Sequence, residues 1–199
     1  MEVIVVLTYY TINKNTMYIA SDNYFNTNTS IAREITGEEY VINKEANKLM
    51  AENCLRFSSN YLHRKAITKD MTNITSKPPI MIDFFGSYIY FPLFSDRNSY
   101  NLWFNIRHIK QYEKDESRTR VHFYNGEDIV VDVTYYQFDK QYSNAMKLYY
   151  KISLRREAFY RETEVNDRSL LSHRETLMLD EFKRHEYLMH MQQLDYGVY

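Results

Sequence analysis

The residues best suited to chemistry in this chain are cationic and lie between Cys54 and Asp83, where the sequence reads CLRFSSNYLHRKAITKDMTNITSKPPIMID. Its Lys, Arg and Asn side chains stand among small polar and aromatic residues, and they include Arg56, Asn60, Arg64, Lys65, Lys69 and Lys77. Lys and Arg neutralise phosphates and release counterions, and a guanidinium can enter a narrow A·T minor groove. Asn60 could hydrogen-bond acceptors on the floor of that groove. An exposed polar segment of this composition therefore indicates contact with duplex DNA, and the alternative is an ordinary solvated cationic loop.

The charge distribution along the chain supports a polyanionic partner. Residues 54–120 carry eleven Lys/Arg against six Asp/Glu, whereas residues 1–53 and 121–199 each have a net charge of −3. The overall net charge of −1 therefore hides a basic middle segment between two acidic ends. Such a sign asymmetry is typical of proteins that bind nucleic acid through one region.

Catalytic and metal-binding signatures are missing from the sequence. It contains no phosphate-binding glycine loop, no nucleophile elbow and no zinc-protease motif. Cys54 is the only cysteine, and we expect it to be half-buried between strands. His108 and His122 alternate with apolar residues, while His185 and His190 lie five apart on different helix faces. We therefore expect no enzyme activity, no catalytic residues, no metal site and no cofactor.

The compartment is predicted from the same composition. A single cysteine rules out an intrachain disulfide and fits a reducing cytosol. The apolar N-terminus lacks the basic start and long core of a signal peptide, and no run reaches the length of a membrane span. We expect a cytoplasmic protein with no membrane association.

Two β-hairpins are predicted in the middle of the chain. Residues 80–94 read as strand–turn–strand with a turn near Gly86 and Ser87, after the helix-breaking pair Pro78–Pro79. Residues 118–133 form the second hairpin around Asn125–Gly126. Of two possible registers, a three-residue loop is preferred because it gathers the apolar residues on one face, with Gly126 at positive φ. That register pairs Phe123 with Glu127, Val121 with Ile129 and Thr119 with Val131.

The remaining elements follow from periodicity and turn signals. We expect strands over residues 3–10, 17–20, 40–43 and 103–112, and a short helix over residues 30–35 that ends at Gly37; residues 44–52 remain ambiguous. In the last third the apolar spacing changes to three and four, which predicts a helix over residues 136–161. The capping-box pattern Ser172–Glu175 begins a second helix that reaches about Gln193. Strands followed by helices predict an α+β fold with an antiparallel, β-rich core over residues 1–133, which contains the basic segment 54–83. Two C-terminal helices within residues 134–199 pack on this core, so that the chain forms one domain.

The same residues carry a resemblance to a known family. The order C-x-R-F-x-S-x-Y-x-x-R-K at residues 54–65, followed by KPPIMID at residues 77–83, resembles the ComK family of bacterial competence transcription factors. The likeness continues through Phe91–Pro92, Trp103, His108, Lys110 and the strands that flank Asn125–Gly126. It covers roughly residues 30–160.

The resemblance implies an activator of genes for DNA uptake and recombination. It implies recognition of A-runs and T-runs mainly through the minor groove, dimers that pair on a promoter, and delivery to a Clp protease by an adaptor protein. Combined with the basic segment, it suggests that Arg56, Arg64 and Lys65 read groove width and phosphate position. Lys69, Lys77, Arg107 and Lys110 would then serve as outer phosphate contacts.

Three other interpretations stay open at this point. The chain could be a paralogue that binds DNA without activating competence genes. It could be a protein-interaction module that acts through its C-terminal helices. A hydrolase using His108 or His122 with a carboxylate is the third alternative.

Overall fold

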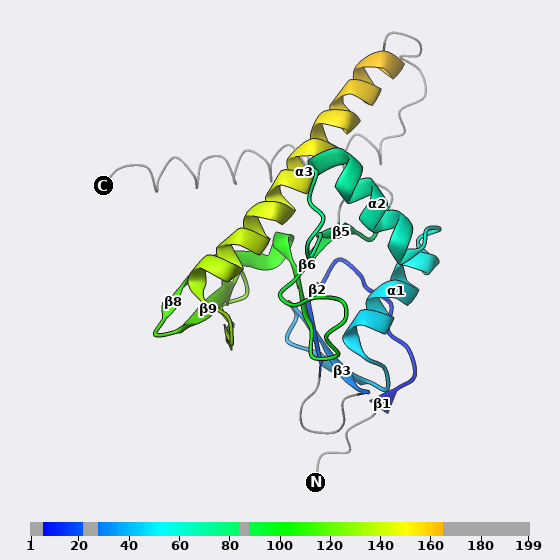
Figure 1. Cartoon of the computed structure of the whole chain (residues 1–199). Helices are drawn as coiled ribbons and strands as arrows, with labels where there is room; N and C mark the ends of the chain where they lie inside the picture. The colour runs from blue at the N-terminus through cyan, green and yellow to red at the C-terminus, as the bar shows by residue number, and fades with distance from the viewer. Residues whose placement is uncertain (1–5, 22–27, 84–87, 165–199) are drawn as a thin grey trace, which may run out of the picture. The chain divides into compact units, whose positions relative to one another are not determined.

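The computed structural model describes residues 6–21, 28–83 and 88–164 of the 199-residue chain (Figure 1). The chain divides into two compact units, Met1–Leu154 and Arg155–Tyr199, and the fold and site described below belong to the first. The predicted helix that begins at Ser172 lies outside the described residues.

In the described part of the first unit, seven strands form the central sheet. They are β1 (Val6–Leu7), β2 (Thr16–Ser21), β3 (Ser30–Glu34), β4 (Glu39–Ile42), β5 (Ile80–Met81), β6 (Ile89–Pro92) and β7 (Leu102–Asn105). Their order is β1-β4-β3-β2-β7-β6-β5, and every pair is antiparallel except the parallel pair of β1 with β4. The 3-10 helix η1 (Ile106–His108) leads from β7 into a second sheet of three strands, ordered β10-β9-β8. These strands are β8 (Ile109–Asp115), β9 (Arg118–Phe123) and β10 (Asp128–Val131).

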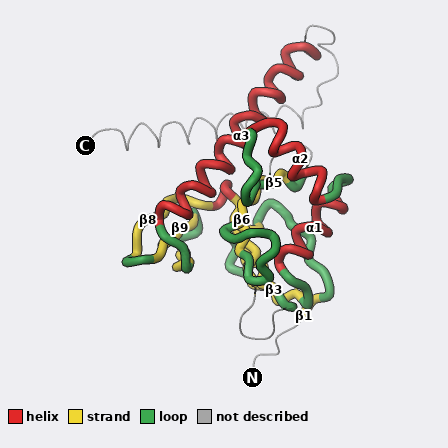
Figure 2. The backbone as a smooth tube through the Cα atoms, viewed as in Figure 1, coloured by secondary structure: helices red, strands yellow, loops and turns green. Residues whose placement is uncertain are grey.

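Among the described residues three α-helices accompany the sheets, as the tube in Figure 2 shows: α1 (Ala46–Arg56), α2 (Tyr61–Thr72) and α3 (Tyr135–Glu164). The unit boundary at Leu154 falls within α3. The predicted α+β class, with a mostly antiparallel core and a long helix after the strands, is confirmed.

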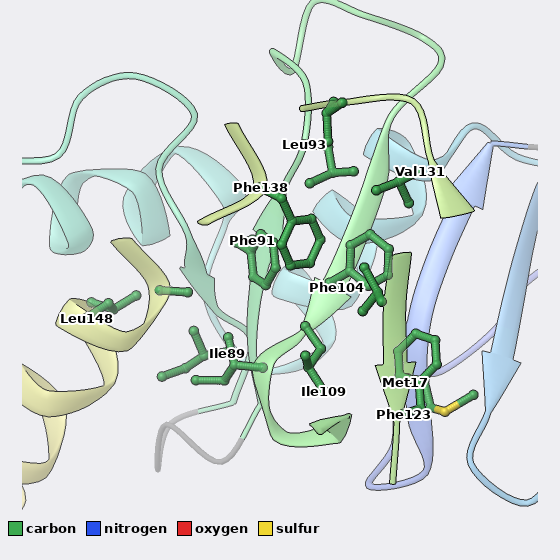
Figure 3. Close-up of a cluster of buried hydrophobic side chains, with 14 of the residues drawn as sticks. Met17, Ile89, Phe91, Leu93, Phe104, Ile109, Phe123, Val131, Phe138 and Leu148 are labelled. Atoms are coloured by element: carbon green, nitrogen blue, oxygen red, sulfur yellow. The ribbon is translucent and has the colours of Figure 1, made fainter. Parts of the chain in front are cut away.

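Side-chain alternation along the central strands separates two hydrophobic cores. On β6, Ile89 and Phe91 face one core, and Tyr90 faces the other. The first core joins the central sheet to the small sheet and α3, with Phe104, Phe123 and Phe138 in ring contact near Phe91 (Figure 3). The second core joins the opposite face to α1; its members include Ile19, Ala32, Leu49, Met50, Cys54, Tyr90 and Trp103. The central sheet is therefore a layer covered on both faces.

Both predicted hairpins are present. β5 pairs with β6, although the expected turn at residues 84–87 lies outside the described residues. In the β9–β10 hairpin Val121 lies opposite Ile129, Thr119 lies opposite Val131, and the amide of Phe123 donates to the carbonyl of Glu127. Gly126 has φ of +88°, so the three-residue loop is confirmed.

Four local predictions were wrong. Residues 30–35 form strand β3, because alternate side chains of Ser30–Glu34 are buried and Gly37, with φ of +98°, turns the chain back into β4. Residues 103–112 are split between two sheets by η1, where the Asn105 side chain accepts from the amide of Arg107. In the described part of residues 3–10 only Val6–Leu7 is a strand, and it pairs with β4. Cys54 is fully buried in α1 instead of half-buried between strands, and burial raises the pKa of its thiol to about 11.

A Schellman motif ends α1 and directs the chain into α2. The amide of Ser59 donates to the carbonyl of Cys54, and the amide of Ser58 donates to the carbonyl of Leu55. Ser58 has φ of +62°, in the left-handed region that favours glycine.

We expect Ser58→Gly to raise the free energy of unfolding by about 0.5–1 kcal/mol, because glycine relieves the steric cost of this conformation. Urea denaturation of the variant beside Ser76→Gly, a change at an exposed loop residue, measures the effect. An equal or lower midpoint for Ser58→Gly would show that this conformation costs nothing.

Candidate nucleic-acid interface

The basic segment is helical where an exposed polar loop was expected. Residues 54–56 end α1, four residues form the connection, and Tyr61–Thr72 form α2. The side chain of Asn60 caps α2 by accepting from the amide of His63 at 2.7 Å. This side-chain oxygen therefore caps the helix. To contact the floor of a DNA groove, as the sequence predicts, Asn60 would have to give up this hydrogen bond.

Arg64 lies inside the protein and is only 4% exposed. Its Nη2 donates to the carbonyl of Phe57 at 2.9 Å, and its Nη1 donates to the carbonyl of Asp83 at 3.4 Å. These bonds join α2 to the end of α1 and to the residue that follows β5 by two positions. A guanidinium held in this way stabilises the fold, and its burial counts against the expected groove contact.

Three lysines of the segment are dispersed. Lys65 Nζ lies 2.6 Å from a carboxylate oxygen of Asp96, and this hydrogen bond lowers the pKa of Asp96. Lys77 Nζ donates to the carbonyl of Leu93 at 2.8 Å. Lys69 is exposed on α2. The structure therefore does not gather the segment's lysines into one patch.

Arg56 and Arg107 do come to the same end of the central sheet. Because β7 is antiparallel to both β2 and β6, the residues before those two strands lie beside the residues after β7. The guanidinium carbon of Arg56 lies 5.1 Å from the centroid of the Tyr9 ring. The ring of the adjacent residue, Phe57, packs edge-on against Tyr88, with 6.4 Å between the two ring centroids. The register of β6 with β7, in which Tyr90 lies opposite Asn105, leads Tyr88 toward Arg107. Burial and the charge of Asp83 raise the pKa of Tyr88, whereas the charge of Arg107 lowers it.

Lys110 follows on β8 and is exposed, so we call Arg56, Arg107 and Lys110 the basic end. Guanidinium groups next to aromatic rings can contact both phosphates and base edges. The basic end can therefore supply the chemistry that the sequence assigned to the whole segment.

Sequence reasoning missed two residues at this end. Tyr9 is 59% exposed and supports Arg56. Lys14 is exposed, and its carbonyl accepts a hydrogen bond from Nε2 of His108 at 2.9 Å. The turn-prone Asn13–Asn15 could have indicated an exposed lysine, but only the fold brings that turn beside η1.

Other kinds of site find little support in the described part of the chain. Residues 6–21, 28–83 and 88–164 contain no group of three or more His, Cys, Asp or Glu placed to hold a metal ion. His122 Nε2 lies 3.2 Å from Glu113 Oε1, as a cross-strand pair between β9 and β8. Among the described helices, none combines the length and apolar character needed to cross a membrane.

Comparisons with known proteins identify the family of this chain. The family model described as ComK protein matches residues 7–157. A protein of Bacillus subtilis (strain 168) named "Competence transcription factor" is 31% identical over 103 residues, which cover 51% of this chain and 54% of that protein. The match thus spans about half the length of this relative, and no solved structure matches the chain. The match to the family model spans well over half of the chain and contains the basic end, so the chain belongs to the ComK family.

Proposed function

We propose that this chain is a cytoplasmic, DNA-binding transcription activator of competence genes, which serve DNA uptake and recombination. The observation that carries the proposal is its membership of the ComK family over residues 7–157, a span that contains Arg56, Arg107 and Lys110. The relative from Bacillus subtilis is named as a competence transcription factor, which supports the same role here.

In this proposal the basic end reads A/T-rich DNA mainly through the minor groove. A·T pairs lack the guanine amino group in that groove, and A-tracts narrow it, so that its negative potential attracts arginine. Arg56 and Arg107 enter or border the groove, and Lys110 contacts the backbone. Lys69 and Lys77 remain outer phosphate contacts, Lys65 contributes if Asp96 releases it, and Asn60 and Arg64 act by holding α2 in place.

The proposal includes assembly and turnover. Two A/T runs are matched by two basic ends in a symmetric dimer, and dimers pair on a promoter. The family resemblance adds an adaptor that delivers the protein to a Clp protease. In this proposal the protein binds DNA without a cofactor and catalyses no reaction.

Fluorescence anisotropy at several salt concentrations tests the proposal. A labelled duplex with phased A- and T-runs is compared with a duplex of equal length in which G·C pairs replace the runs. We expect tighter binding to the A·T duplex and a steep fall of affinity with salt, because phosphate contacts release counterions.

The other outcomes separate the alternatives. Equal affinity for both duplexes would show that the protein does not recognise DNA sequence. Absence of binding to either duplex at low salt would favour the alternative in which the chain is a protein-interaction module. Preferred binding without activation of a reporter promoter would identify a DNA-binding paralogue.

A further inference from the structure

The outer face of α3 carries a row of lysines that the function described above does not use. Within Tyr135–Leu154, the inner face of the helix packs into the first core through Phe138, Ala145, Leu148 and Ile152. The exposed lysines of the same turns are Lys140, Lys147 and Lys151, which we call the lysine stripe.

The spacing of the three lysines places them on one face. Steps of seven and four residues each return close to the same direction on a helix of 3.6 residues per turn. At 1.5 Å per residue the steps are about 10 and 6 Å along the axis. The lysine stripe is therefore a straight row of three cations over about three turns of helix.

No carboxylate of these turns faces the lysine stripe. Asp139 is the only acidic residue between Tyr135 and Leu154. It is half-buried, and one of its carboxylate oxygens accepts a hydrogen bond of 2.8 Å from the Tyr112 hydroxyl on β8. The stripe thus keeps its positive charge, although residues 121–199 as a whole have a net charge of −3.

The stripe leads toward the basic end of the central sheet. Phe138, at the start of α3, contacts Phe91 in the middle of β6. Leu148, almost three turns later, belongs to the same core as Ile89, the first residue of β6 (Figure 3). Ile89 is next to Tyr88, and the register of β6 with β7 leads from there toward Arg107 at the basic end. The last lysines of the stripe therefore project from turns of α3 that pack into the core containing the first residue of β6.

We propose that the lysine stripe is a second DNA contact, which binds phosphates of the same duplex whose groove the basic end reads. The inference rests on the proposed function. Lysine suits this task because its ammonium is a mobile point charge that binds phosphate without the fixed geometry of a guanidinium. Such contacts hold the duplex in position and carry no sequence information.

The test replaces Lys140, Lys147 and Lys151 together by Gln, which keeps helix propensity and removes three charges. We expect the slope of log affinity against log salt to fall by up to about 2.7 units, because each neutralised phosphate contributes about 0.9. Affinity should fall by the same factor on the A·T and G·C duplexes, so that the preference for A·T is retained. Circular dichroism and the urea midpoint check that the helix and fold are intact.

A matched control changes three exposed cations elsewhere, Lys48, Lys114 and Arg118, to Gln. This control should keep the wild-type slope, which excludes an effect of net charge alone. An unchanged slope in the stripe variant, with wild-type preference for A·T intact, would overturn the inference and leave the proposed function standing. Absence of DNA binding by the wild-type protein would instead overturn the proposed function and the inference with it.

Discussion

Replacement of Arg56 and Arg107 together by alanine is expected to weaken binding to the A·T duplex by about 100-fold and to remove most of the preference over G·C. Each arginine at a base edge or groove contributes about 1–3 kcal/mol, and 1.4 kcal/mol corresponds to tenfold in affinity. Both side chains lie at one end of the central sheet, where Arg56 rests on Tyr9. Anisotropy on the two duplexes measures the change.

Two further variants sharpen this prediction. Arg56→Lys with Arg107→Lys keeps both charges but loses the planar guanidinium, so the salt slope should persist while the preference for A·T falls. Lys114→Ala with Arg118→Ala removes the same charge from the far end of the β8–β9 hairpin and should keep the preference. Full A·T preference in the double alanine variant at the basic end would exclude that end as the reading surface.

The second large effect is expected for Arg64→Ala, and it concerns stability. The substitution leaves the carbonyls of Phe57 and Asp83 without their donor and opens a cavity under α2. We expect the free energy of unfolding to fall by about 2–4 kcal/mol, because both a buried hydrogen-bonded charge and its packing are lost. Urea denaturation with a constant m-value measures it.

Lys69→Ala, on the exposed side of the same helix, is the control and should change stability by no more than about 0.5 kcal/mol. If Arg64→Ala kept the wild-type midpoint and lost DNA affinity instead, the side chain would have to leave its buried position to contact DNA. That result would restore the groove contact expected from the sequence.

The elements that could be predicted from the sequence have strong local periodicity. The β9–β10 hairpin combines alternating apolar residues with Asn125–Gly126, and only one register buries those residues together. The first turns of α3 repeat apolar residues at three and four, which tertiary packing against Phe91 and Phe104 preserves.

The helices of the basic segment could not be predicted in the same way. The side chains that α2 buries are Arg64, Thr68 and Thr72, which are four residues apart but polar. A search for apolar periodicity therefore finds no helix there. The two hydroxyls are satisfied by the carbonyls of Pro79 and Thr68, contacts that become visible only in the fold.

The sequence predicted the chemical type of the candidate site but only part of its location. Charge counting along the chain found Arg56, Arg107 and Lys110. It could not tell that the fold brings Arg56, at the end of α1, to the end of the sheet where Arg107 follows β7. It could not distinguish an exposed cation from a buried one such as Arg64. It also passed over the lysine stripe, because the net charge of residues 121–199 includes the many acidic residues outside Tyr135–Leu154.

The claim that the chain reads A/T runs from the minor groove is tested most directly by inosine substitution. An I·C pair presents the minor groove of A·T, because it lacks the guanine amino group, and keeps the major-groove hydrogen-bonding pattern of G·C. Anisotropy would compare three duplexes that differ only in the runs: A·T, I·C and G·C. We predict that the I·C duplex binds close to the A·T duplex and well above G·C. Binding of I·C at the level of G·C would contradict minor-groove recognition and point to readout in the major groove.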